Sequence, residues 1–226
     1  MNSVLNKRIL RDLRSNFGRY AALMLMIILG IYLVVSIVGA SELVIVGTEN
    51  AKSKNMVEDG QFSVFIPLTE NELDRLTDKG TVIERMFSFD ADCSNGSVLR
   101  VFKTREKIDL ITLDEGKNGD INEAVIEKNY ASVNNIKIGD VITISGINVK
   151  ISGIGSVPDY DAALKTFASP AVDSKTFGII FVTGNTYDQL LEAADKTESY
   201  TYAFKLGNET HEELKEKIEN LDFDYE

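Results

Sequence analysis

The longest apolar run in the chain extends from Tyr20 to Ala40 and reads YAALMLMIILGIYLVVSIVGA, with no charged residue before Glu42. A helix of this length measures roughly 31 Å, which matches a bilayer hydrocarbon core of about 30 Å. The run also lacks the polar face that a surface helix of a soluble protein shows. The pattern therefore predicts a transmembrane helix over residues 20–41.

The charges on either side of this span predict its orientation. Residues 1–19 have a net charge of +4, because one acidic residue opposes five basic ones: Lys7, Arg8, Arg11, Arg14 and Arg19. Residues 42–60 hold two lysines and four acidic residues. The positive-inside rule then places residues 1–19 in the cytoplasm and the rest of the chain outside the cell membrane.

A cleaved signal peptide is the alternative to a membrane anchor. Val38-Gly39-Ala40 offers the small residues that a signal peptidase needs. The apolar run is longer than the usual signal-peptide core of about 7–15 residues, and the segment before it is also long. The lengths therefore favour an anchor.

Two patterns near the span suggest contacts. Leu5, Ile9, Leu13 and Phe17 recur every four residues, which predicts an amphipathic helix within residues 1–19. Its basic face would contact lipid headgroups of the inner leaflet, and contact with a cytoplasmic partner is the second interpretation. Within the span, small residues at helical spacing would allow close helix packing, and these are Ser36, Gly39 and Ala40.

After the span, residues 42–58 are expected to continue as a helical stalk, and short strands and helices follow. The strands are expected over residues 61–66, 81–90, 98–102, 108–113, 124–127, 141–144, 149–154, 177–182 and 200–206, with the opening of one more over 222–226. The helices are expected over residues 69–80, 128–133, 186–194 and 210–220. Thr69 with Glu72 forms a capping-box signal, and Ser145-Gly146 a hairpin-turn signal. The fold class is therefore α+β, with an extracytoplasmic domain over residues 59–226 that is expected to be incomplete at its C-terminus.

Charge and composition exclude several functions. The whole chain carries −11, so the part after residue 19 carries −15 and would repel nucleic acid. Cys93 is the single cysteine, which rules out an intramolecular disulfide, and His211 is the single histidine. The sequence has no HExxH, GxSxG or GxxxxGK[ST] motif. We therefore expect no catalytic, cofactor-binding or metal-binding residues, and no enzyme.

Two stretches resemble a known family. Residues 7–36, in which Asn16-Phe17-Gly18-Arg19-Tyr20 leads into the span, resemble the start of FtsX-like ABC transporter permeases. Further along, a series of short stretches in the family's order resembles the MacB-like periplasmic core domain. Its family-motif positions are Glu123, Gly139, Asp140, Gly153 and Pro158. The resemblance implies a βαβ porter-like part with a small β-rich inserted part.

The same resemblance implies a function. Such permeases have four spans, form homo- or heterodimers, and work with a separate cytoplasmic ABC ATPase, which is the subunit that uses ATP. The chain would then be the N-terminal part of a permease subunit whose ectodomain transmits ATP-driven motion to export or to extracytoplasmic processes. Three later spans are missing from these 226 residues, as expected for either a truncated permease or a natural short product. The alternative is a single-pass anchored binding or sensor protein for a peptide, lipid or cell-wall ligand.

Overall fold

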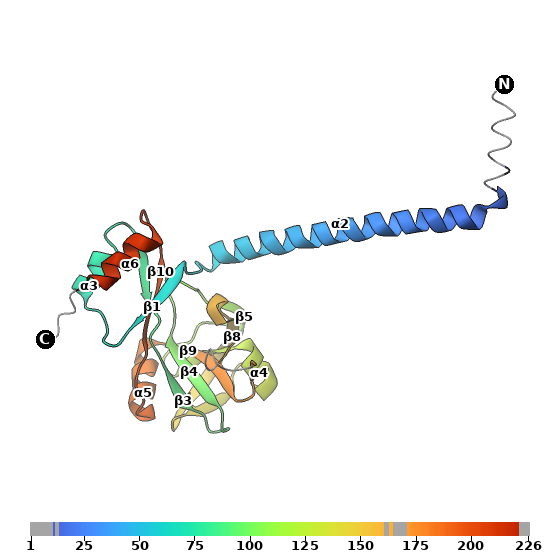
Figure 1. Ribbon diagram of the computed structural model, residues 1–226. Helices are drawn as coiled ribbons and strands as arrows, with labels where there is room; N and C mark the ends of the chain where they lie inside the picture. Colours follow the sequence, from blue (N-terminus) through green and yellow to red (C-terminus); the bar gives the residue numbers. More distant parts are fainter. Residues whose placement is uncertain (1–10, 12–13, 161–162, 165–170, 222–226) are drawn as a thin grey trace. The chain divides into compact units, whose positions relative to one another are not determined.

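A computed structural model describes residues 11, 14–160, 163–164 and 171–221. The chain divides into two compact units, Met1–Ala51 and Lys52–Glu226. The first unit consists of most of one long helix, and the second is a mixed α+β domain (Figure 1). The predicted α+β class is confirmed.

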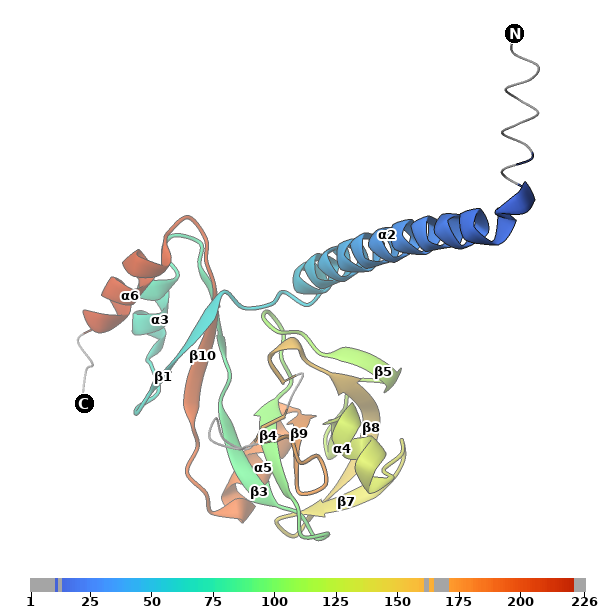
Figure 2. The same cartoon turned by 45° about the vertical axis from the view of Figure 1, so that its right-hand side comes forward.

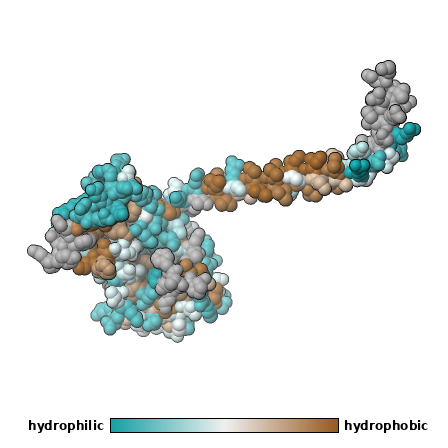
Figure 3. Space-filling model, in the orientation of Figure 1, coloured by the Kyte–Doolittle hydropathy of each residue, from teal (hydrophilic) through white to brown (hydrophobic). Residues whose placement is uncertain are grey.

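The long helix, α2, spans Phe17–Lys54. Its large apolar side chains between Leu23 and Val46 are exposed, and Figure 3 shows them as an apolar band that covers most of this part of the helix. Within the described part of the chain, α2 is the one helix long and apolar enough to cross a membrane. The stalk was predicted to continue to residue 58, but the helix ends at Lys54, because Met56 has a φ of 51°, outside the helical region.

A small antiparallel sheet forms one part of the second unit. Its strands are β1 (Gly60–Val64), β2 (Val82–Arg85) and β10 (Tyr200–Lys205), in the order β1-β10-β2. Helices α3 (Glu70–Leu76) and α6 (His211–Glu219) lie side by side (Figure 2) and pack Leu76 and Leu214 against Tyr202 of the sheet. Because β1 and β2 are parallel with β10 between them, β1-α3-β2 is a split βαβ unit. This is the porter-like part that the resemblance implies.

A larger mixed sheet is inserted between β2 and β10. Its order is β3-β4-β9-β6-β8-β5, with β7 paired to β8. The strands are β3 (Ser88–Asp92), β4 (Val98–Lys103), β5 (Thr112–Gly116), β6 (Glu123–Glu127), β7 (Val141–Ile144), β8 (Ile147–Ser156) and β9 (Phe177–Val182). Helices α4 (Lys128–Asn134) and α5 (Gly184–Ala194) contribute Tyr130 and Leu190 to its main core, and a 3₁₀ turn, η1, covers Pro158–Tyr160.

Several predicted elements differ from the structure. The strand predicted over 61–66 ends at Val64, and the helix predicted over 69–80 ends at Leu76. The strand predicted over residues 81–90 is two strands, β2 and β3, which belong to different sheets. The break includes Met86, which is buried and packs with Ile108 and Ala203. The strand predicted over 108–113 begins only at Thr112, because the chain around Ile108 forms a loop. The strand opening predicted over 222–226 lies outside the described residues.

Candidate functional site

The basic residues predicted to contact the inner leaflet are partly described. Arg11, Arg14 and Arg19 are exposed, whereas Lys7 and Arg8 lie outside the described residues. The small residues Ser36, Gly39 and Ala40 are in the middle of α2, and nothing lies within 4 Å of a Cβ built on Gly39. Membrane contact and helix packing therefore stay predictions.

The structure gathers four of the five family-motif residues around strand β8. The carboxylate of Glu123 accepts a hydrogen bond from Lys150 Nζ at 3.1 Å. Gly139, at a φ of 92°, donates its N–H to the carbonyl of Ile151 at 2.8 Å, and the carbonyl of Asp140 accepts the Ile151 N–H at 2.8 Å. These contacts fasten the turn at residues 139–140 and strand β6 to β8.

Gly153 and Pro158 have different roles. A Cβ on Gly153 would lie 2.6 Å from the carbonyl oxygen of Lys117, so only glycine allows β8 to approach the chain after β5 this closely. Pro158 opens η1 and places Asp159 against Arg105. The family-motif residues therefore have structural roles. Through Asp159, which follows Pro158, they adjoin a second group of residues that the sequence did not predict as a site.

This second group begins with the entry segment, Asn55–Asp59, which directly follows α2. On one side it is bonded to the seam loop, Thr104–Ile111, which connects β4 and β5. Leu110 N–H donates to Asn55 O at 2.8 Å, Asp109 N–H donates to Met56 O at 3.2 Å, and Glu58 N–H donates to Asp109 Oδ1 at 3.1 Å. On the other side, Asp59 N–H donates to Phe204 O at 2.9 Å, and Lys205 Nζ donates to Val57 O at 3.0 Å. The entry segment is thus bonded to both the large-sheet connection and β10 of the small sheet.

The seam loop is itself anchored to the small sheet. The carboxylate of Glu84, in β2, accepts the backbone N–H groups of Glu106, Lys107 and Ile108 at 2.7, 2.8 and 2.5 Å. Hydrogen bonds to a charged acceptor are about twice as strong as neutral ones. The loop is therefore held where the two sheets meet.

Arg105 fixes the opposite side of the seam loop. Its Nη1 and Nη2 donate to the two carboxylate oxygens of Asp159 at 2.6 and 2.8 Å, and Nη1 also donates to the carbonyl of Asp109 at 3.3 Å. The guanidinium lies over the rings of Phe102 and Phe181, at 5.1 and 5.2 Å from their centroids. This buried arginine joins the seam loop, η1 and the core beneath β4 and β9.

Two carboxylates at the site have raised pKa values. Burial, followed by the charges of Asp109 and Asp159, raises the pKa of Glu58 from 4.5 to about 7. Burial, followed by the charge of Asp159, raises the pKa of Asp109 from 3.8 to about 6, although Arg105 and the Glu58 N–H act in the opposite direction. Burial is the largest cause of both shifts, and Asp109 is also the acceptor for the Glu58 N–H of the entry segment.

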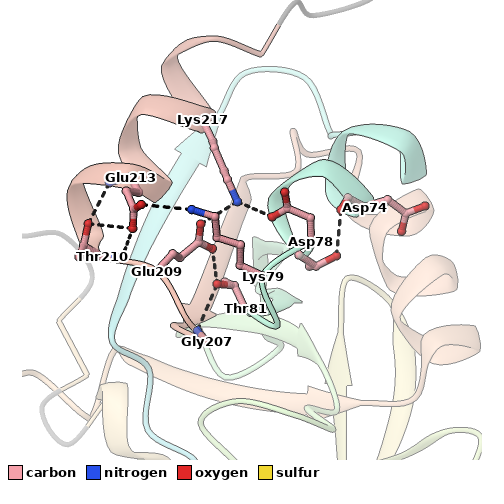
Figure 4. Close-up of polar contacts among 10 residues, drawn as sticks. Asp74, Asp78, Lys79, Thr81, Gly207, Glu209, Thr210, Glu213 and Lys217 are labelled. Atoms are coloured by element: carbon pink, nitrogen blue, oxygen red, sulfur yellow. Dashed lines mark hydrogen bonds and ion pairs between the residues drawn. The ribbon is translucent and has the colours of Figure 1, made fainter.

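A polar network fixes α6 to the α3–β2 connection (Figure 4). Lys217 is ion-paired with Asp78 and, at 2.7 Å, with Glu209, whose side chain is fully buried. Thr81 donates its hydroxyl to Glu209 and accepts the Gly207 N–H at 3.2 Å. The network therefore joins α6 to the connection between α3 and β2.

An open groove of about 400 Å³ lies beside the seam loop. It is lined by α3, β2 and the chain from Lys103 to Lys107, and its charges are mixed, including Glu70, Arg85 and Lys107. No group of three or more His, Cys, Asp or Glu side chains in the described part of the chain could hold a metal ion. His211 is exposed and lies 3.3 Å through Nε2 from the carbonyl of Asp59.

The described geometry defines a class of protein: a long apolar helix leads directly into a two-sheet α+β domain. No protein-family profile and no curated protein sequence matches the chain. Solved structures do match. One is the extracellular domain of the noncanonic ABC-type transporter YknZ from Gram-positive bacteria, with 12% identity, a TM-score of 0.37, and 71% of this chain and 87% of that chain covered. Another is the periplasmic region of MacB from Actinobacillus actinomycetemcomitans, with 10% identity, a TM-score of 0.41, and 68% and 72% covered.

The second of these structures carries the MacB name that also appears in the sequence resemblance.

Proposed function

We propose that the chain is the N-terminal part of an FtsX/MacB-like ABC transporter permease subunit, anchored in the cell membrane with its N-terminus in the cytoplasm. A cytoplasmic ATPase drives motion of the spans, and α2 delivers that motion to the ectodomain. The subunit works as a dimer and supports export or another extracytoplasmic process.

One observation carries this proposal: the entry segment is hydrogen-bonded both to the seam loop, which connects two strands of the large sheet, and to β10 of the small sheet. A mere tether needs only a flexible connection between anchor and domain. Here the chain leaves α2 at Lys54 and is bonded within a few residues to Leu110 on one side and Phe204 on the other. A displacement of the helix end therefore reaches both sheets at once.

Orientation can be tested by cysteine labelling on intact cells. Cys93 is 7% exposed, so a membrane-impermeant maleimide reacts with added cysteines before it reaches the native one. The proposal predicts labelling of Lys137→Cys on intact cells, and of Arg14→Cys only after lysis. The reverse pattern would overturn the topology and, with it, the permease assignment.

Function can be tested by copurification and hydrogen exchange. The natural protein, solubilised from its own membrane, is expected to copurify with a P-loop ATPase. Addition of ATP to this complex should change hydrogen exchange in the entry segment and the seam loop. A four-residue Gly-Ser insertion after Lys54 should abolish that change but keep the ATPase bound, since it separates α2 from the bonded segment.

The matched control is the same insertion after Lys196, at an exposed position in the connection between α5 and β10. This insertion should leave the ATP-dependent change intact. An ATP response that survives the Lys54 insertion, or a protein that purifies without any ATPase, would contradict the proposal.

A single-pass binding or sensor protein is the second candidate. The groove beside the seam loop favours it, because a ligand in that groove would contact both Glu84 of β2 and the loop that holds the entry segment. Purification without an ATPase, together with chemical-shift or exchange changes in the groove on addition of a peptide or cell-wall fragment, would support this candidate instead.

A further inference from the structure

β2 is an edge strand of the small sheet, because β10 is the one strand paired with it in the described part of the chain. Arg85 lies opposite Tyr202, and the next residue, Met86, donates its N–H to Thr201 O at 2.7 Å. In an antiparallel ladder the peptide groups of alternate residues face the same neighbour. The peptide groups of Ile83 and Arg85 therefore face away from β10, and none of the described residues forms a hydrogen bond with them.

This free edge borders the groove beside the seam loop. The groove has a volume of about 400 Å³, and three consecutive residues of β2, from Ile83 to Arg85, line it. Pockets that hold ligands measure roughly 300–1,000 Å³. The other lining residues come from α3 and from the chain between Lys103 and Lys107. An extended chain laid in the groove would therefore run alongside the unpaired peptide groups of β2.

Both walls of the groove are held in place by contacts within the domain. The α3 wall is one face of the helix, since its lining residues have the spacing i, i+3, i+4, i+7: Glu70, Leu73, Asp74 and Thr77. The opposite wall is fixed because the Glu84 carboxylate accepts three backbone N–H groups of the seam loop. Walls that are ordered before a ligand arrives lower the entropic cost of binding.

The charges of the groove favour a basic ligand. Two of its three basic side chains, Arg85 and Lys103, are already held in ion pairs, at 2.6 and 3.0 Å. The third, Lys107, is adjacent to Glu106. Asp74 is exposed on the α3 wall and forms no ion pair with the described residues. The part of the chain after residue 19 also carries −15, which attracts cations at long range.

We infer that the groove binds an extended, basic peptide segment of a partner protein, which pairs with β2 as an additional strand. Main-chain hydrogen bonds to Ile83 and Arg85 supply the affinity. Side chains of a strand alternate between its two faces, so every second side chain of the peptide lies on the α3 side, where a lysine or arginine meets Asp74. The inference gives a ligand class to the groove of the second candidate function. It does not depend on the permease assignment, which the copurification experiment tests separately.

Binding is measured on the full chain in micelles of an uncharged detergent, by fluorescence anisotropy of a labelled peptide. The probe is a hexapeptide of alternating lysine and valine, in which valine favours the extended conformation. One control peptide has the same side chains but N-methyl groups on its main chain, and a second has glutamate in place of lysine. Each control should bind at least about tenfold more weakly. The first loses its main-chain donors, and the second brings acids to Asp74.

Hydrogen exchange locates the bound probe. At saturation, the probe should slow exchange about fivefold or more in peptides that cover residues 82–86, because it supplies acceptors to outward-facing amides of β2. Exchange in residues 60–64, which form β1 at the opposite edge of the same sheet, should change less than about twofold.

Two pairs of variants separate strand addition from general attraction. Arg85→Pro removes the N–H that faces the groove but no hydrogen bond of the β2–β10 ladder, whereas Arg85→Ala loses the same side chain and keeps that N–H. The proline variant should bind the probe about tenfold more weakly than the alanine variant. Asp74→Lys should weaken binding about fivefold. Glu216→Lys makes the same change of charge at an exposed position on α6 and should stay within about twofold of the wild type.

Four results would overturn the inference. These are a wild type that does not bind the probe, equal binding of the N-methylated peptide, protection of β1 instead of β2, and equal affinities of Arg85→Pro and Arg85→Ala. If the proline variant folds poorly, the comparison of Asp74→Lys with Glu216→Lys decides, and equal affinities of these two would also contradict the inference.

Discussion

Arg105 and Asp159 are joined by two parallel hydrogen bonds, at 2.6 and 2.8 Å, and the arginine side chain is only 2% exposed. The pair links the seam loop to η1, although strands β5 to β8 lie between these two segments in the sequence. Because Arg105 also bonds to the Asp109 carbonyl, the pair holds the loop on which the entry segment rests. Its loss should therefore affect both stability and the site.

We predict that Asp159→Asn lowers the free energy of unfolding by about 3 kcal/mol, because it leaves a buried guanidinium without its counter-charge. Urea unfolding of the full chain in detergent micelles, followed by circular dichroism, measures the change. The control is Asp188→Asn, which removes the exposed pair with Lys103 and should cost less than about 1 kcal/mol. Equal effects of the two variants would mean that burial of Arg105 is not what matters.

A second prediction concerns the packing of α4 on β9. A Cβ added to Gly178 would lie 2.4 Å from ring atoms of Tyr130, whose ring is buried and whose hydroxyl is hydrogen-bonded to Ser97 and Asn95. Gly178→Ala should therefore destabilise the domain by about 2 kcal/mol through overpacking. Thermal unfolding measures it, with Gly184→Ala as the control. Nothing lies within 4 Å of a Cβ at Gly184, so that variant should leave the melting temperature unchanged or slightly raised.

A third prediction concerns the network that fixes α6. Lys217→Met keeps the length of the side chain but leaves the buried Glu209 without its ion-pair partner, so we expect a loss of about 2–4 kcal/mol. Lys215→Met, on the same helix, removes only the exposed pair with Glu219 and should cost less than about 0.5 kcal/mol. Hydrogen exchange in α6 and in residues 77–81 should increase together in the first variant. An increase confined to α6 would show that the network does not join the two segments.

A fourth prediction is the pH dependence of global stability. Since the pKa values of Glu58 and Asp109 are raised in the folded state, their stabilising contribution is present at low pH and is lost as pH rises towards 7. Relative to Glu58→Gln with Asp109→Asn, the wild type should lose on the order of 2 kcal/mol between pH 5 and pH 8, after allowance for solvent screening of the half-buried Glu58. Parallel urea titrations at both pH values give this difference. Parallel pH profiles for the two proteins would argue against it.

Local elements were predictable where the signal lies within a few residues. The continuous apolar run Phe177–Val182 is a strand with the predicted bounds, and Thr69 with Glu72 and Thr210 with Glu213 form complete capping boxes. The hairpin turn at Ser145-Gly146 has φ values of 47° and 85°, as its sequence indicates. Such signals involve residues that are close in sequence, so they can be recognised before the fold is known.

The division of the domain into two sheets was not predictable in the same way. Residues 81–90 read as one strand because strand propensity says nothing about which partner a strand takes. The strand is interrupted at Met86 and Phe87, and the partners of its two parts, β10 and β4, come from distant parts of the sequence. The same limit applies to the site, since Asp109 reads as an ordinary polar residue and charged side chains are rarely expected in a core.

The bonds that hold the entry segment are mostly between peptide groups: Leu110 to Asn55, Asp109 to Met56, and Asp59 to Phe204. Every residue except proline supplies a peptide donor and acceptor, whatever its side chain. Substitutions at these positions therefore leave the three peptide hydrogen bonds available, whereas the bonds from Glu58 to Asp109 Oδ1 and from Lys205 Nζ to Val57 depend on the side chains. An attachment made by peptide hydrogen bonds leaves no sequence motif. It can be found in other proteins by comparing their backbone structures.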